Sequence, residues 1–204
     1  MLLAELFVLL ALDPDGTPAR GYSNQSSSEL GVTGALITVL VQQGHLDLRD
    51  GRIHITGTNP SHPLLIQVLE NLSAHDGKKL KTHLSRIKHS GWREVVDTMI
   101  DDGKLGCDKS TLRPTHHPVL CVDDQQALLA RVRAAATSDV AMDDETACLL
   151  ALAGPSQLLE IVAPDRADRT IAKRRIAEAS LRVPVAAAVK YAAEAAVVAV
   201  VASS

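Results

Sequence analysis

Apolar residues recur at helical spacing across residues 30–44, and the pattern then switches to strict alternation. Leu36 and Leu40 share one helical face, and Gly44 stands where a helix typically ends on a residue with positive φ. The next residues, HLDLRDGRIHI, alternate around an Asp-Gly pair, which favours a type I′ turn because that turn needs positive φ at both central residues. The stretch therefore predicts a helix followed by a β-hairpin. One buried face of the hairpin would carry Leu46, Leu48, Ile53 and Ile55.

A weaker copy of this pattern occurs further along the chain, in WREVVDTMIDDGKLGCDKSTLRP. Its apolar helical face is followed by Asp102-Gly103, and then by Leu105 and Leu112 on either side of polar turn residues at 108–110. We therefore expect a second helix and hairpin in this region.

Most of the remaining chain has the periodicity of helices, separated by breaks rich in Pro, Gly and Asp. Pro63 is expected to open one helix, and Asp123 or Asp124 to cap another. The polar residues from Thr17 to Ser28 predict a loop. Further helices are expected over residues 2–12, 64–72, 123–137, 142–154, 155–163 and 163–183.

Both ends of the chain are apolar, but neither has the full pattern of a membrane signal. The first segment carries Glu5 and lacks a basic leading region. In the last segment, Lys190 and Glu194 interrupt the apolar run and stand four residues apart, where they would pair on a helix. We therefore expect an amphipathic or buried first helix and a buried C-terminal helix. The fold class is mainly α, a single multi-helix domain with short β-hairpins over residues 1–204.

Composition narrows the classes of protein that fit. The chain has 204 residues, 46% of them hydrophobic and only 2% aromatic, so aliphatic side chains must fill the core. Three cysteines without a C-x-x-C pair are typical of a reducing compartment, which predicts a cytoplasmic protein. A net charge of −3 argues against nonspecific nucleic-acid binding over the whole surface.

The strongest basic cluster surrounds the only tryptophan, Trp92. A solvated helix face, with Trp92 filling a gap in the core, is the ordinary interpretation of such a cluster. The functional interpretation is a site for an anion or a lipid head group, because guanidinium groups bind phosphate and indole favours the membrane interface. Both interpretations stay open. The basic residues are Lys78, Lys79, Lys81, Arg86, Lys88 and Arg93. A second basic segment, IAKRRIAE, has Asp165, Asp168 and Glu178 nearby, which favours an ordinary salt-bridged surface.

Motifs of catalysis are missing from the sequence. It has no G-x-S-x-G, H-E-x-x-H, P-loop or G-x-G-x-x-G pattern, and its paired acidic residues stand at predicted helix ends, where capping explains them. His116-His117 lacks a third metal ligand at a recognisable spacing. We therefore expect a binding protein without a metal or a cofactor, and not an enzyme.

The order of these elements resembles the Golgi phosphoprotein 3 family along nearly the full chain. The segments that carry the resemblance are LLAELFVLLALDPDG, GALITVLVQQGHLDL, HPLLIQVLENL, WREVVDTMIDDGKL, HHPVL, DETACLLALAG, IAKRRIAE and AAVVAVVA. Each segment alone is a weak signal, whereas their joint order and spacing are specific.

The resemblance implies a mostly helical domain that acts as a peripheral membrane adaptor. Eukaryotic relatives bind phosphatidylinositol 4-phosphate and the cytosolic tails of glycosyltransferases. The head-group pocket of the family uses a tryptophan and three arginines, whose positions align here with Asn24, Thr33, His89 and Trp92. None of the four is the family residue at its position, so the pocket is not carried over.

Basic residues close to these positions in the sequence offer substitute donors. We hypothesise that Arg20, Lys88 and Arg93, together with the Trp92 indole, form a lipid head-group site.

Three functions remain as alternatives. The first is a cytoplasmic, peripheral protein on the inner face of the membrane that binds anionic phospholipid, phosphatidylinositol 4-phosphate by resemblance. The second is a protein-interaction or oligomerisation module, with cytosolic protein tails or a second copy as partners. The third is a winged-helix-like nucleic-acid binder, against which the net charge counts. The Ala, Val, Asp and Arg bias is typical of a GC-rich bacterial gene, and a bacterium has no Golgi.

Overall fold

The computed structural model of the chain describes residues 1–19, 21, 25–108 and 116–202. Over these residues it is mainly helical with one short antiparallel hairpin, which confirms the predicted fold class. The elements are α1 (Leu3–Ala11), α2 (Gln25–Gln42), β1 (Leu46–Arg49), β2 (Arg52–Ile55), α3 (Pro63–Ser73), the 3-10 helix η2 (Leu80–Thr82), α4 (Leu84–Asp101), α5 (Val122–Thr137), α6 (Asp144–Ala153), α7 (Leu159–Val162), α8 (Arg169–Arg182) and α9 (Pro184–Ala202).

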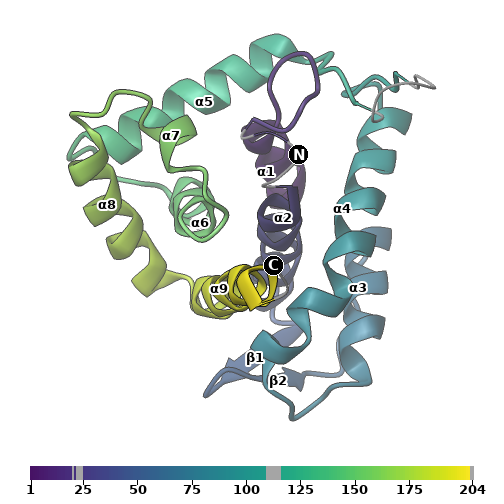
Figure 1. The fold of residues 1–204 in the computed structure, drawn as a ribbon. Coiled ribbons are helices and arrows are strands. Elements are labelled where there is room, and N and C mark those ends of the chain that lie inside the picture. The colour runs from purple at the N-terminus through teal and green to yellow at the C-terminus, as the bar shows by residue number, and fades with distance from the viewer. Residues whose placement is uncertain (20, 22–24, 109–115, 203–204) are drawn as a thin grey trace.

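Helix α2 lies at the centre of the molecule. It packs against α1, α3, α4, α6 and α9, with α3 and α4 on one side and the α5–α8 segment on the other (Figure 1). Two glycines allow the closest of these contacts. A Cβ atom at Gly34 would lie 2.6 Å from Val189 in α9, and one at Gly31 would overlap the buried ring of Phe7 in α1. Neighbouring elements surround α2, and for this reason its apolar residues are not confined to one face.

The first hairpin forms as predicted. Leu46 pairs with Ile55 and Leu48 with Ile53, so the four apolar side chains share one face, and Leu46 and Ile53 are fully buried. Asp50 and Gly51 both have positive φ, as the type I′ turn requires. The chain then adds a short third segment to this sheet, because the Ile53 N–H donates to the Lys78 carbonyl and the Leu80 N–H to the Gly51 carbonyl. This segment was not foreseen.

Other boundaries differ from the prediction. The predicted loop from Thr17 to Ser28 is wrong at its end, because α2 begins at Gln25. A helix was expected over residues 155–163, but only the single turn of α7 forms there, because Gln157 adopts a positive φ that a helix does not allow. Helix α5 starts after Cys121, with Asp123 and Asp124 inside its first turn rather than at the cap.

The second predicted hairpin is only partly recognisable in the described residues. Leu105 pairs with Val119 and Asp108 with His116 as isolated bridges, so the returning arm lies further along the chain than the expected Leu112. Leu112 and the turn positions 109 and 110 lie outside the described residues.

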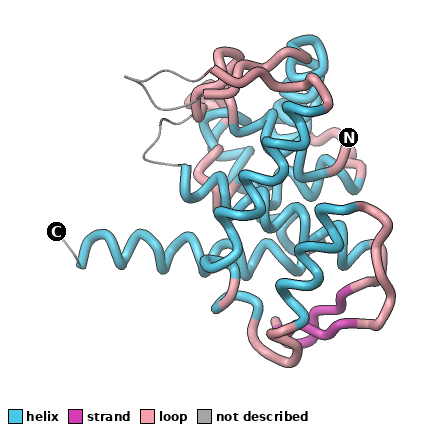
Figure 2. Tube along the Cα trace, turned by 90° about the vertical axis from the view of Figure 1, so that its right-hand side faces the viewer, coloured by secondary structure: helices cyan, strands magenta, loops and turns pink. Residues whose placement is uncertain are grey.

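Over residues 184–195, where side chains are described, one face of α9 is buried and the other is exposed, so the expected burial is found on one face of this part. Val185 and Val189 pack into the core, whereas Tyr191 is 48% exposed. Lys190 and Glu194 lie 4.0 Å apart, as their spacing predicted. The last turns project from the body of the molecule (Figure 2). Among the described helices, none is both long and apolar enough to cross a membrane.

Candidate functional site

An open groove runs between the first turns of α2 and the middle of α4. We call it the α2–α4 groove, and its volume is about 520 Å³. In Figure 1, α2 lies beside α4 towards the centre of the molecule. The lining residues are Gln25 and Glu29 from α2, His89, Ser90, Trp92, Arg93, Val96 and Asp97 from α4, and His117 from the segment that precedes α5.

Helical spacing and a close helix crossing create this groove. His89, Arg93 and Asp97 are four residues apart along α4 and therefore lie on one face of it. The two helices approach closely just below them, where a Cβ atom at Gly91 would lie 2.9 Å from the Thr33 Oγ1. Trp92 is 9% exposed and packs mainly into the core beneath the groove.

A buried carboxylate dominates the electrostatics at one end of the groove. Glu29 is 5% exposed, its Oε2 lies 2.8 Å from His89 Nδ1, and its Oε1 accepts a hydrogen bond from Gln25 Nε2 at 3.4 Å. Lys88, the residue before His89, donates to the Ser26 hydroxyl at the start of α2. These contacts tie the first turns of α2 to α4.

The opposite end of the groove is more open. Arg93 and Asp97 are both exposed, and no carboxylate of the described residues lies within ion-pair distance of the Arg93 guanidinium. The Ser90 hydroxyl donates back to the Ile87 carbonyl at 2.9 Å, so it serves the helix. The groove thus offers one unpaired guanidinium, two imidazoles and two carboxylates, a set suited to polar recognition.

The structure brings part of the predicted head-group site together. His89, Trp92 and Arg93 line the groove, whereas Lys88 is not among its lining residues and donates to the Ser26 hydroxyl. Thr33 is 1% exposed under the helix crossing, so a ligand in the groove does not reach it. Arg20 and Asn24 lie outside the described residues.

The basic cluster expected from the sequence is divided in space. Lys79 and Lys81 line a different pocket beside the hairpin and α9, away from the α2–α4 groove. The side chain of Arg86 is not among those described. Among the described lysines and arginines of this cluster, Arg93 alone lines the groove.

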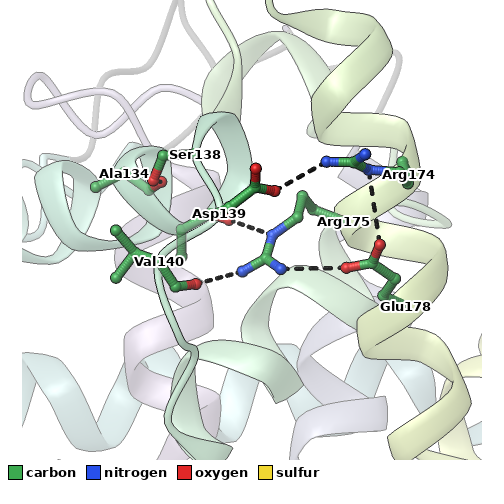
Figure 3. Close-up of polar contacts among 8 residues, drawn as sticks. Ala134, Ser138, Asp139, Val140, Arg174, Arg175 and Glu178 are labelled. Carbon is green, nitrogen blue, oxygen red and sulfur yellow. Dashed lines mark hydrogen bonds and ion pairs between the residues drawn. The ribbon is translucent and has the colours of Figure 1, made fainter.

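The second basic segment, in α8, forms structural contacts. Arg175 donates to the carbonyls of Ala135 and Val140 at 3.1 and 2.5 Å, and Arg174 pairs with Asp139 at 2.9 Å (Figure 3). Glu178 binds both arginines, at 3.6 and 3.1 Å. The predicted salt-bridged surface is confirmed, although Asp139 takes the role expected of Asp165 and Asp168.

Three groove residues do not stand out in the sequence, Gln25, Glu29 and Asp97, and His117 was considered only as a metal ligand. Gln25 and Glu29 stand at the predicted boundary between a loop and a helix, and their i,i+4 spacing was the available signal. His117 reaches the groove from a segment 20 residues beyond Asp97, and no local pattern encodes that contact. In the part of the chain that is described, no group of three metal-ligating side chains converges.

Comparison with known proteins places the chain in a family. The family model Golgi phosphoprotein 3 (GPP34) matches residues 3–196. In the comparison with curated proteins, nothing matches this chain. The family is one of binding proteins, associated with phosphoinositide lipids and with protein partners. The match runs from α1 into α9 and so includes every element of the α2–α4 groove, and the chain therefore belongs to the Golgi phosphoprotein 3 family.

Proposed function

We propose that this chain is a peripheral membrane-binding protein whose α2–α4 groove takes the anionic head group of a phospholipid. The observation that carries the proposal is the convergence of His89, Trp92 and Arg93 on one open groove. The Arg93 guanidinium is exposed and lacks a carboxylate partner among the described residues, which leaves its fork of donors for a phosphate. Family membership supports the same class of ligand.

The charges of the groove favour a head group with a single phosphate. Glu29 and Asp97 stand in the same groove as Arg93, and carboxylates repel the additional phosphate of a phosphoinositide. Thr33, at a position where the family has an arginine, is buried. Binding is therefore proposed to be general for anionic phospholipids, without selectivity for phosphatidylinositol 4-phosphate.

The proposed location is the cytoplasmic face of a membrane. All three cysteines are free thiols, which suits a reducing compartment. Among the described lysines and arginines, Arg93 alone lines the groove, and one such residue contributes about 1 kcal/mol near an anionic surface. Attachment is therefore weak and sensitive to salt.

Vesicle co-sedimentation tests this function. The membranes are phosphatidylcholine alone, phosphatidylcholine with phosphatidylserine, and phosphatidylcholine with phosphatidylinositol 4-phosphate, each at 20 and 150 mM salt. We expect binding to both anionic membranes at low salt, reduced at the higher salt, and none to the neutral one. Arg93→Ala should weaken binding about fivefold.

A matched control separates the groove from general charge. Lys173→Ala removes one exposed positive charge from α8, outside the groove, and should leave vesicle binding unchanged. Equal effects of Arg93→Ala and Lys173→Ala would contradict a groove-bound head group. Absence of binding to every membrane would leave the protein-interaction module as the function of this chain.

A further inference from the structure

A second pocket lies between the hairpin, η2 and the start of α9. We call it the hairpin–α9 pocket, and its volume is about 390 Å³. Its walls are Leu48, Asp50 and Gly51 of the hairpin, Lys79, Leu80 and Lys81 around η2, and Pro184, Ala187, Ala188 and Tyr191 of α9. None of these residues lines the α2–α4 groove, so a ligand of the hairpin–α9 pocket is independent of the proposed function.

Helix α9 has a second apolar face, which forms one wall of this pocket. Val185, Val189 and Ala192 are buried against the body of the protein. Pro184, Ala187, Ala188 and Tyr191 follow the spacing i, i+3, i+4 and i+7 and therefore form a separate stripe. Pro184, Ala187 and Tyr191 are exposed on this stripe. A helix that needs only one apolar face for folding thus presents another to solvent.

The rim of the pocket carries two lysines, Lys79 and Lys81, against one aspartate, Asp50. Lys81 lies with its Nζ 3.8 Å from the centre of the Tyr191 ring, a cation–π contact that holds the ammonium at the pocket wall. Within the described residues, neither Lys79 nor Lys81 has a carboxylate at ion-pair distance. Both ammonium groups are therefore available to a ligand.

The surroundings of the pocket reinforce this charge. The hairpin, the segment before η2 and η2 itself hold five basic residues against three acidic ones, although the whole chain carries −3. Asp47 pairs with Arg49 at 2.7 Å, which removes one charge of each sign and leaves the positive excess unchanged. The basic residues are Arg49, Arg52, Lys78, Lys79 and Lys81, and the acidic ones are Asp47, Asp50 and Asp76.

We propose that the hairpin–α9 pocket docks an acidic peptide segment of a partner protein, which inserts one apolar side chain between Leu48 and the Ala187–Tyr191 stripe and pairs its carboxylates with Lys79 and Lys81. Charge complementarity selects the acidic segment. The concave shape favours an inserted side chain over a flat bilayer surface, because a pocket of a few hundred Å³ encloses one large side chain, as the anchoring hot spots of interfaces do.

Selection from a displayed library of random 12-residue peptides, with the full chain as bait, tests this inference. We expect the enriched peptides to combine several Asp or Glu residues with one large apolar residue. Binding of a synthetic enriched peptide, followed by fluorescence anisotropy, should fall at least tenfold in Lys81→Glu. It should also fall in Ala187→Leu, which fills the pocket without changing charge.

Lys173→Glu is the matched control, because it makes the same charge reversal on an exposed lysine of α8. Circular dichroism of each variant establishes that it folds. Enrichment of peptides without acidic character, equal losses in Lys81→Glu and Lys173→Glu, or no enrichment at all would overturn the inference. The inference would also be overturned if the chain bound phosphatidylserine vesicles through Lys81 and bound no enriched peptide. Vesicle binding that requires Arg93 reports on the proposed function alone.

Discussion

The buried carboxylate of Glu29 lies 2.8 Å from the imidazole Nδ1 of His89, across the crossing of α2 and α4. This contact places a negative charge inside the groove that is proposed to receive an anion. Asp97 adds a second negative charge, which is more exposed, at the other end of the α2–α4 groove. The two carboxylates therefore limit the affinity of the groove for phosphate.

Removing the exposed carboxylate should strengthen membrane binding. Asp97→Asn keeps the size of the side chain and deletes its charge, so we expect the affinity for phosphatidylserine vesicles to rise about two- to fivefold at low salt. Asp101→Asn is the matched control, because it deletes the same charge on the same helix outside the groove. If co-sedimentation rises equally for both variants, net charge rather than the groove sets the affinity.

The contact between α1 and α2 depends on the absence of a side chain at Gly31. A methyl group there would overlap the Phe7 ring and the Ser156 hydroxyl, both fully buried. We expect Gly31→Ala to destabilise the fold by about 1–3 kcal/mol through overpacking, despite the better helix propensity of alanine. Urea denaturation measures the change. Adding Phe7→Leu should make the cost of Gly31→Ala smaller, and a Gly31→Ala protein as stable as the original would refute the packing argument.

The end of α1 is capped by a side chain from a distant helix. Gln125 in α5 is 1% exposed and donates through Nε2 to the carbonyls of Leu9 and Leu12, at 2.9 and 2.7 Å. Gln125→Leu leaves both buried carbonyls without this donor, so we expect a loss of about 2–4 kcal/mol in the free energy of unfolding. The neighbouring Gln126 is exposed, and Gln126→Leu should change stability by less than about 0.5 kcal/mol. Similar losses in the two variants would contradict the role given to Gln125.

The start of α6 should make stability depend on pH. Asp143 accepts a hydrogen bond from the Thr146 N–H at 2.6 Å, and this bond lowers the pKa of its carboxyl below the usual value. A carboxyl with a lowered folded-state pKa stabilises the fold above its unfolded pKa, and this contribution is lost as the pH falls through the folded value.

Asp143→Ala tests this dependence. At pH 7 the variant should be about 1 kcal/mol less stable than the original chain, as expected for the loss of an N-cap. The difference, measured by urea denaturation from pH 7 to pH 3, should shrink as the pH falls below the usual carboxyl range near 4. A difference that stays constant with pH would show that the charge of Asp143 does not contribute.

Much of the secondary structure follows from local pattern. The Asp50-Gly51 turn and the alternation around it determine the hairpin. The turn needs two consecutive residues with positive φ, and the alternation must bury the apolar side chains of both strands, so few pairing registers of the strands are possible. The proline at Pro63 and the Asp143 cap mark helix starts by equally local chemistry. The joint order of such segments also identified the family, which the match over residues 3–196 shows.

Local pattern fails where a segment takes its conformation from a distant partner. Residues 25–28 look like a polar loop, yet they form the first turn of α2, where Lys88 from α4 binds Ser26. The sequence likewise groups six basic residues around Trp92, but the turn of the chain through η2 into α4 sends Lys79 and Lys81 to α9 and leaves Arg93 in the α2–α4 groove.

The sequence by itself determined the helices, the hairpin and the family of this protein, because propensity, capping and turn chemistry act over a few residues. Only the tertiary structure decided which charges share a site. Glu29 meets His89, and Lys81 meets Tyr191, across 60 and 110 positions of chain, and such contacts depend on how whole helices pack. The composition of a groove between two helices is a property of their crossing, which no short segment of sequence encodes.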